Sequence, residues 1–152
     1  MSSNNKDRVK FKNHTDVVGT PVKKTSRIER YFDLTKNVAF NSQYGKIRHG
    51  AVLIKGGSVK NVSFNKDKYN SFGDRFRDKG RGPATVHAEL GCILGLSRSV
   101  TSGSDLYVCR INKNGEFRYS KPCSMCHDAL KHVGVKRVYY TTNDNTIEMY
   151  KL

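Results

Sequence analysis

The chain has 152 residues, a mass of 17.2 kDa and a formal charge of +15, from 28 Lys plus Arg against 13 Asp plus Glu. This length is that of one domain with a single core, and the longest purely apolar run, 51–54, excludes a membrane helix, which needs about 20 apolar residues. The excess of cations favours a polyanion, nucleic acid first, as the partner, and the alternative is a solubilising surface that binds RNA only adventitiously.

Residues 1–26 are predicted to form a flexible basic arm, because Ser, Asn, Lys and Asp surround only a few thinly spread apolar residues. The cations of the arm are candidates for phosphate binding or for a nuclear address, and the alternative is a solvated tail. The domain proper is therefore predicted to span 27–152.

The first predicted helix runs from about 27 to 41, with Ser26 and Glu29 at capping-box spacing and apolar residues at helical spacing after them. A strand over 50–55, a two-glycine turn and an alternating strand over 58–64 predict a β-hairpin. Asn65 follows the hairpin, where an Asn is a common strand-ending residue.

A long loop is predicted over 66–84, where cations alternate with aromatic residues. Loops of this length in compact domains are usually functional or disordered. Interleaved cations and rings suit a single strand of nucleic acid, because phosphates need charge and splayed bases need an aromatic face. The candidate strand contacts are Phe72, Arg75, Phe76, Arg77, Lys79 and Arg81. The alternative is that the two phenylalanines fill the core.

A second helix is predicted to begin at an N-cap, Thr85, and to run to about Leu96, with apolar residues at helical spacing. His87 and Glu89 then lie in its first turn. Gly91 and Gly95 suggest close packing of this helix against another backbone.

The C-terminal half alternates between strands and a helix. Strands are predicted over 105–111 and 116–120, around a turn at 112–115, and over 136–142. A helix is predicted to begin at Cys123 and to end near Val133, and a helix that connects two strands implies that they pair in parallel. Ile147 and Tyr150 indicate a short edge strand or a docked tail.

Four cysteines do not indicate disulfides here, because two of them form a metal-ligand pair and no apolar signal sequence opens the chain. This favours an intracellular location, cytoplasmic or nuclear. Cys92 and Cys109 are interpreted as buried, inert residues. His14 and His49 are expected at the surface.

Two stretches carry the chemistry: His87-Ala88-Glu89, and Pro-Cys-x-x-Cys with Cys123 and Cys126. One imidazole and two thiolates supply three zinc ligands, and Glu89 is a carboxylate that does not bind the metal. Catalytic zinc keeps its fourth position for water, whereas structural zinc has four protein ligands. The sequence thus indicates a catalytic site, and the alternative is a structural site closed by His127 or His132.

This pattern, His-x-Glu followed by Pro-Cys-x-x-Cys, resembles the zinc-dependent deaminases of the cytidine and deoxycytidylate deaminase superfamily. The resemblance implies an α/β fold of three layers, in which a mixed central β-sheet carries helices on both faces. It implies one Zn²⁺ per chain, held by His87, Cys123 and Cys126, with Glu89 as the proton shuttle. It also implies Asn65 and Ala88 as substrate contacts.

The resulting hypothesis is zinc-dependent hydrolytic deamination of cytosine to uracil in single-stranded DNA or RNA. Three alternatives stay open: adenosine-to-inosine deamination in tRNA, deamination of free (deoxy)cytidylate, and a non-catalytic, zinc-stapled nucleic-acid-binding module. The Met125 between the two cysteines is a feature in which the sequence resembles the tRNA adenosine deaminases. The long spacer between the two motifs leaves the substrate subclass open. The protein is expected to be a monomer or a small homo-oligomer.

Overall fold

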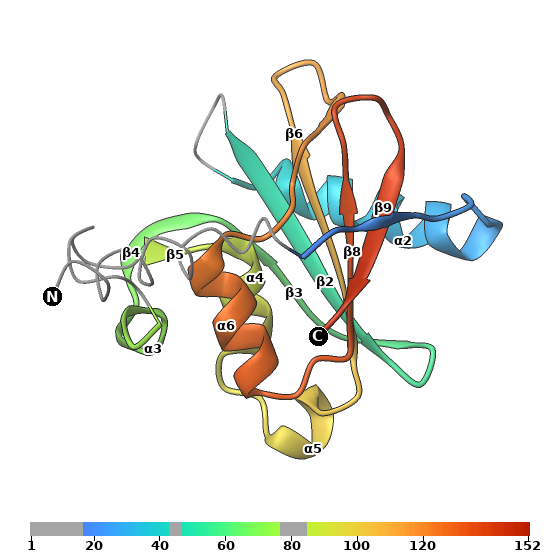
Figure 1. The fold of residues 1–152 in the computed structure, drawn as a ribbon. Coiled ribbons are helices and arrows are strands. Elements are labelled where there is room, and N and C mark those ends of the chain that lie inside the picture. The colour runs from blue at the N-terminus through green and yellow to red at the C-terminus, as the bar shows by residue number, and fades with distance from the viewer. Residues whose placement is uncertain (1–16, 43–46, 77–84) are drawn as a thin grey trace, which may run out of the picture.

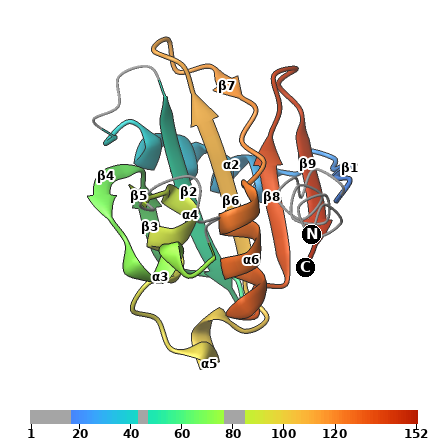
Figure 2. The same cartoon turned by 60° about the vertical axis from the view of Figure 1, so that its left-hand side comes forward.

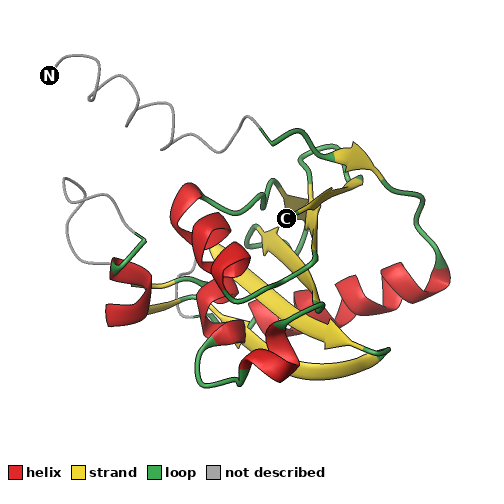
Figure 3. Ribbon diagram, turned by 60° about the horizontal axis from the view of Figure 1, so that its bottom comes forward, coloured by secondary structure: helices red, strands yellow, loops and turns green. Residues whose placement is uncertain are grey.

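The computed structural model describes residues 17–42, 47–76 and 85–152, and it shows one central sheet with helices on both of its faces (Figures 1 and 3). The helices are α2 (Ser26–Ala39), α3 (Ser71–Asp74), α4 (Ala88–Ile93), α5 (Arg98–Thr101) and α6 (Ser124–His132). The strands are β1 (Thr20–Pro21), β2 (Arg48–Lys55), β3 (Ser58–Phe64), β4 (Lys66–Tyr69), β5 (Thr85–Val86), β6 (Asp105–Ile111), β7 (Phe117–Arg118), β8 (Arg137–Thr141) and β9 (Ile147–Lys151). None of the described helices has the length and the apolar character of a membrane span.

The main sheet contains seven strands in the order β1-β9-β8-β6-β2-β3, with β7 paired to β6 (Figure 2). Strands β6 and β8 are parallel, and α6 lies between them in the chain. The other pairs of this sheet are antiparallel. The predicted mixed sheet, including its parallel pair, is therefore confirmed.

Alternation along β2 divides the core into two layers. Ala51 and Leu53 belong to the cluster that also holds the buried residues of α4 and α6, whereas Val52 and Ile54 belong to the cluster with α2. Because successive side chains of a strand point to opposite faces, one strand supports both layers. Helices α4 and α6 thus cover one face of the sheet and α2 covers the other.

Helix α2 begins one residue earlier than the sequence predicts. Its N-cap is Thr25, whose Oγ1 accepts a hydrogen bond from the Ile28 backbone N–H at 3.2 Å, rather than Ser26. Ser and Thr are both good N-caps, so two neighbouring hydroxyl residues leave the exact start undecided in the sequence. The predicted apolar stripe of this helix is buried as expected.

The helix α2 lies directly on β2 at Gly50. A Cβ at this position would lie 2.3 Å from the Thr35 carbonyl oxygen and 2.7 Å from the Ala39 backbone nitrogen. Gly50→Ala is therefore expected to lower the free energy of unfolding by about 3 kcal/mol, because the backbones must separate to admit a methyl group. Chemical denaturation measures this effect, and an unchanged midpoint would contradict such a close approach.

The predicted hairpin is confirmed, with Gly56 and Gly57 at positive φ in the turn between β2 and β3. The loop predicted over 66–84, in contrast, contains regular structure: β4 pairs with β5, and α3 follows β4. Asn70 caps α3, because its Oδ1 accepts from the backbone of Phe72 and Gly73. These elements are too short to show a period in the sequence. Arg77, Lys79 and Arg81 lie outside the described residues.

The helix predicted to begin at Thr85 is shorter than expected. Thr85 belongs to β5, His87 is the N-cap, and the helix α4 ends at Ile93. Gly95 has φ 77 and no atom within 4 Å of its would-be Cβ, so it ends the helix rather than packing against another backbone. A glycine tolerates this left-handed conformation at little cost.

The sheet includes part of the segment expected to be a flexible arm. Thr20 and Pro21 pair with β9, and the Val22 backbone N–H donates to the Ile147 carbonyl at 2.9 Å. The arm predicted to reach residue 26 therefore contributes a strand to the domain. Strand β9 lies between β1 and β8 rather than at the edge, and the strand predicted over 116–120 is limited to β7.

Candidate active site

Two helix starts carry the three predicted metal ligands. His87 is the N-cap of α4, Cys123 is the N-cap of α6, and Cys126 lies in the first turn of α6. Neither cap residue makes a side-chain capping bond, and α4 and α6 pack against each other. The side chains of His87 and Cys123 are thus not engaged in helix capping, and both can meet a common ligand.

The three ligand atoms are arranged as zinc requires. The His87 Nδ1 lies 3.7 Å from the Cys123 Sγ and 3.3 Å from the Cys126 Sγ, and all three atoms lie within 4.8 Å of one another. With ordinary Zn–N and Zn–S bond lengths, a tetrahedral ion separates its nitrogen and sulfur ligands by about 3.6 Å. One nitrogen and two sulfurs at this spacing fit Zn²⁺.

The fourth-ligand alternatives lie elsewhere in the fold. The buried His127 ring stacks on the Tyr150 ring at 5.6 Å, and the His132 ring lies 5.4 Å from the Phe76 ring. In the described ranges, no fourth His, Cys, Asp or Glu joins the three ligands. The geometry therefore supports the site with an open position over the closed structural site.

The two cysteines differ in charge state before metal binds. A hydrogen bond from Cys126 is the largest effect on Cys123 and, together with His87, lowers the pKa of the Cys123 thiol to about 3. Burial raises the pKa of Cys126. Because zinc binds thiolate, metal binding must release the proton of Cys126.

A pocket of about 430 Å³ opens beside the three ligands, a size in the range of small-molecule sites. Its lining consists of Ile47, His49, Asn65, Lys66, His87, Ala88, Glu89, Ser120, Lys121 and Cys123. Glu89 is only 5% exposed, and burial is the main effect that raises the pKa of its carboxyl above the ordinary value. A carboxyl group with a raised pKa thus lies next to the predicted metal ligands.

Asn65 lines this pocket, and its amide also shapes the pocket wall. The Asn65 Oδ1 accepts from the His49 backbone N–H at 2.9 Å, and its Nδ2 donates to the Ile47 carbonyl at 3.0 Å. Both ends of the amide hold the segment that leads into β2. Asn65 therefore positions neighbouring lining residues as well as facing the pocket itself.

The sequence analysis missed five lining residues: Ile47, His49, Lys66, Ser120 and Lys121. His49, which was expected at the surface, is partly buried and lines the pocket. Burial, followed by the charge of Arg110, lowers the pKa of its imidazole to about 4. One signal was present in the sequence: His49 alternates with Ala51 and Leu53, which face the same side of the sheet. His14 lies outside the described residues.

The aromatic residues proposed to stack on bases pack against the protein. Phe72 and Phe76 are partly buried against the core cluster of α4 and α6, with ring centroids 5.3 Å apart. The guanidinium of Arg75 lies over both rings, at 5.6 and 5.9 Å. None of the three residues is among those that line the pocket. Their contact with a nucleic-acid strand stays a prediction.

Phe76→Ala is expected to lower the free energy of unfolding by about 3 kcal/mol, the lower end of the range for core phenylalanines, because the ring is only partly buried. Chemical denaturation measures this loss, and oligonucleotide binding is measured on the same protein. A variant with unchanged stability and much weaker strand binding would instead assign the ring to base stacking.

Comparison with known proteins gives one family and a set of similar folds. A family model described as the cytidine and deoxycytidylate deaminase zinc-binding region matches residues 25–142. The apo dCMP deaminase of cyanophage S-TIM5 superposes with a TM-score of 0.56 and 24% identity, over 80% of this chain and 86% of that chain. The cytidine deaminase of Mycobacterium tuberculosis superposes with a TM-score of 0.48 and 17% identity, over 78% and 86%. Comparison with curated protein sequences gave no match.

Proposed function

The chain belongs to the family of cytidine and deoxycytidylate deaminases that carry a zinc-binding region, and we propose that its substrate is a cytosine base within single-stranded nucleic acid. As a member of this family it is a zinc-dependent hydrolase that acts on C–N bonds. Deamination replaces the amino group on C4 of cytosine by an oxygen from water and releases ammonia. A base inside a duplex must be flipped out first, which favours single strands.

His87, Cys123 and Cys126 would hold the zinc ion, which lowers the pKa of its bound water to about 7 and so supplies the nucleophile at neutral pH. Glu89 moves the protons: it accepts one from the water and delivers protons to the ring nitrogen and to the departing amino group. Its place in the pocket lining, two residues after His87 and outside the ligand set, supports this role. The buried Ala88 lies between the ligand and the carboxylate.

The observation that carries the choice of substrate is the cationic lining of the pocket. Lys66 and Lys121 line it, and Glu89 is the one acidic side chain among the described lining residues. Lys121 also donates a hydrogen bond from Nζ to the Val17 carbonyl. This bond places Val17 next to a residue of the pocket lining. Charges at and next to a pocket suit a base that is flanked by phosphates.

The test is a parallel incubation with single-stranded DNA, single-stranded RNA and free dCMP, in which uracil formation is measured at several salt concentrations. We expect deamination of the oligonucleotide, with an affinity whose logarithm falls by about 0.7 per phosphate contact for each unit of log salt. The dependence for dCMP is expected to be much shallower. Brisk turnover of dCMP with no conversion of oligonucleotides at low salt would refute the strand substrate.

Free (deoxy)cytidylate is the second candidate, because the same two pocket lysines would meet the phosphate of a mononucleotide. Adenosine in tRNA is the third candidate, and its support is the sequence resemblance at Met125. This residue is 3% exposed, packs in the core cluster and is not among the residues that line the pocket.

A further inference from the structure

A row of three basic residues crosses the sheet next to the catalytic pocket. His49 of β2 pairs with Arg110 of β6, and Arg110 pairs with Arg118 of β7. Directly paired residues of neighbouring strands project to the same face of a sheet. The row begins at His49, which lines the catalytic pocket, and ends at Arg118, which lines a second pocket.

Among the described residues, the fold compensates the charges of this row only in part. The Nε of Arg110 is buried and has no hydrogen-bond partner in the part of the chain that the structure describes. Arg118 lies opposite Arg110, and its ion pair, with the carboxylate of Glu116, has a separation of 3.8 Å at the surface. Like charges opposite each other and an unsatisfied buried donor both destabilise a protein. An anion bound between the arginines would offset both effects.

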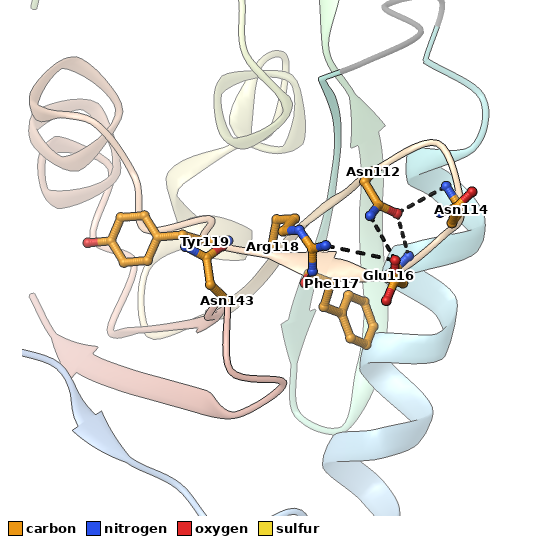
Figure 4. A network of polar contacts seen from close by, with 7 residues as sticks. All are labelled: Asn112, Asn114, Glu116, Phe117, Arg118, Tyr119 and Asn143. Atoms are coloured by element: carbon orange, nitrogen blue, oxygen red, sulfur yellow. Dashed lines mark hydrogen bonds and ion pairs between the residues drawn. The ribbon is translucent and has the colours of Figure 1, made fainter.

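The second pocket has a volume of about 410 Å³ and is lined by Lys36, Asn114, Gly115, Glu116, Phe117, Arg118, Asn143 and Asn145. Glu116 is occupied within the protein, because it accepts a hydrogen bond from the Asn112 amide at 3.0 Å and pairs with Arg118 (Figure 4). The pocket therefore offers two cations, three side-chain amides and one aromatic ring. This combination matches a nucleotide, since amides pair with base edges and cations pair with phosphate.

The segment that contains β7 contributes residues to both pockets. Arg118 lines the second pocket, while Ser120 and Lys121 line the catalytic pocket. In Figure 4 the guanidinium of Arg118 points toward Glu116. The ring of Tyr119, the residue between Arg118 and Ser120, points away from Arg118. The Tyr119 backbone N–H donates to the Asn143 Oδ1 at 2.9 Å, which ties β7 to the loop before β9. A nucleic-acid strand that extends from the catalytic pocket along this segment would therefore reach the row of basic residues and then the second pocket.

We propose that Arg110 and Arg118 bind the phosphodiester that joins the target nucleotide to its neighbour, and that the second pocket receives this neighbouring nucleotide. The inference rests on the proposed function and adds to it the requirement for a substrate of at least two linked nucleotides. The planar guanidinium groups are suited to bind phosphate oxygens in pairs.

The first test compares Arg118→Gln with Lys113→Gln. Lys113 is exposed, lies in the turn before β7 and lines neither pocket, so its loss removes the same charge from the same region. Fluorescence anisotropy with a short labelled cytosine oligonucleotide at low salt is expected to show about a tenfold loss of affinity for Arg118→Gln. The salt slope should also fall by about 0.7, the value for one phosphate contact with a single strand. Lys113→Gln is expected to change neither quantity, and equal effects of the two variants would overturn the proposal.

A second variant tests whether Arg110 serves the ligand or the fold. Arg110→Met keeps the aliphatic part of the side chain and removes the guanidinium, whose Nε is buried without a hydrogen-bond partner among the described residues. We expect weaker oligonucleotide binding together with a higher melting temperature of the free protein, because the unsatisfied buried donor is gone. A lower melting temperature with unchanged binding would assign Arg110 to structure and overturn its part in the row.

Turnover separates this inference from the proposed function. We expect Arg118→Gln to lower kcat/KM for a cytosine-containing trinucleotide at least tenfold more than for dCMP. If the wild-type protein binds oligonucleotides through Arg118 but deaminates only dCMP, the proposed function fails and the row remains a strand-binding site. If it deaminates oligonucleotides and Arg118→Gln behaves like Lys113→Gln, only the row is refuted.

Discussion

Replacement of Glu89 by Gln is expected to lower kcat for deamination by about 10²–10⁴-fold, the usual contribution of a positioned proton-transfer group. The reason is the place of the carboxyl group in the site. Glu89 lines the pocket beside His87, is nearly buried, and is not one of the three residues whose atoms cluster as metal ligands. Glutamine keeps the shape of the side chain but neither accepts nor delivers the protons that the reaction moves.

The same variant is expected to retain one zinc per chain and to unfold at an unchanged or higher denaturant concentration, because it removes an ionisable group from a buried position. Metal analysis and chemical denaturation give these two values. The matched control is Glu29→Gln, which changes an exposed carboxylate that lines neither pocket. Activity of Glu89→Gln within a few-fold of wild type would remove Glu89 from the mechanism.

Loss of Cys126 is expected to have the second large effect: Cys126→Ser should lose zinc on dialysis against a chelator, and deamination should become undetectable. Cys126 is fully buried, and its Sγ lies 3.3 Å from the His87 Nδ1. A serine hydroxyl in this place is a poor zinc ligand, since it does not ionise at neutral pH and is shorter than a thiolate. The metal would then be held by two protein ligands instead of three.

The control for this variant is Cys92→Ala, which removes a buried thiol from α4 without touching the ligand set. Cys92→Ala is expected to retain one zinc per chain, as measured by elemental analysis after gel filtration. Full zinc stoichiometry in a Cys123→Ser, Cys126→Ser double variant would show that the ligands are misassigned.

The elements predicted best from the sequence are those with a sustained hydrophobic pattern. Helices α2 and α6 each bury one face and show a helical period, whereas strands β2, β6 and β8 are buried on both faces and show runs of apolar residues. Strand β1 has two exposed residues and exists because its backbone pairs with β9, more than 120 positions away. Such an element leaves no pattern of its own in the sequence. Strands β4 and β5 and helix α3 also leave no pattern in the sequence, because they are too short to show a period.

The candidate site divides in a similar way. The metal ligands and Glu89 were predicted because zinc requires particular ligand atoms, and the residues that carry them stand at characteristic spacings in two short motifs of the sequence. His49, Lys66 and Lys121 were not predicted, because strand ends and connections bring them to one pocket. The row from His49 to Arg118 depends on the register of three strands, and register appears only when the strands have paired.

The separation of the metal ligands along the chain determines when the metal centre can form during folding. His87 and Cys123 are 36 positions apart, and α4 and α6 pack against each other on one face of the sheet. Closing this loop costs conformational entropy before any zinc bond is gained, and long-range strand pairing is slow. Zinc therefore binds late, after the strands have assembled, and contributes its binding free energy to the completed structure. In a refolding experiment, zinc uptake should report the end of tertiary assembly, well after the helices themselves have formed.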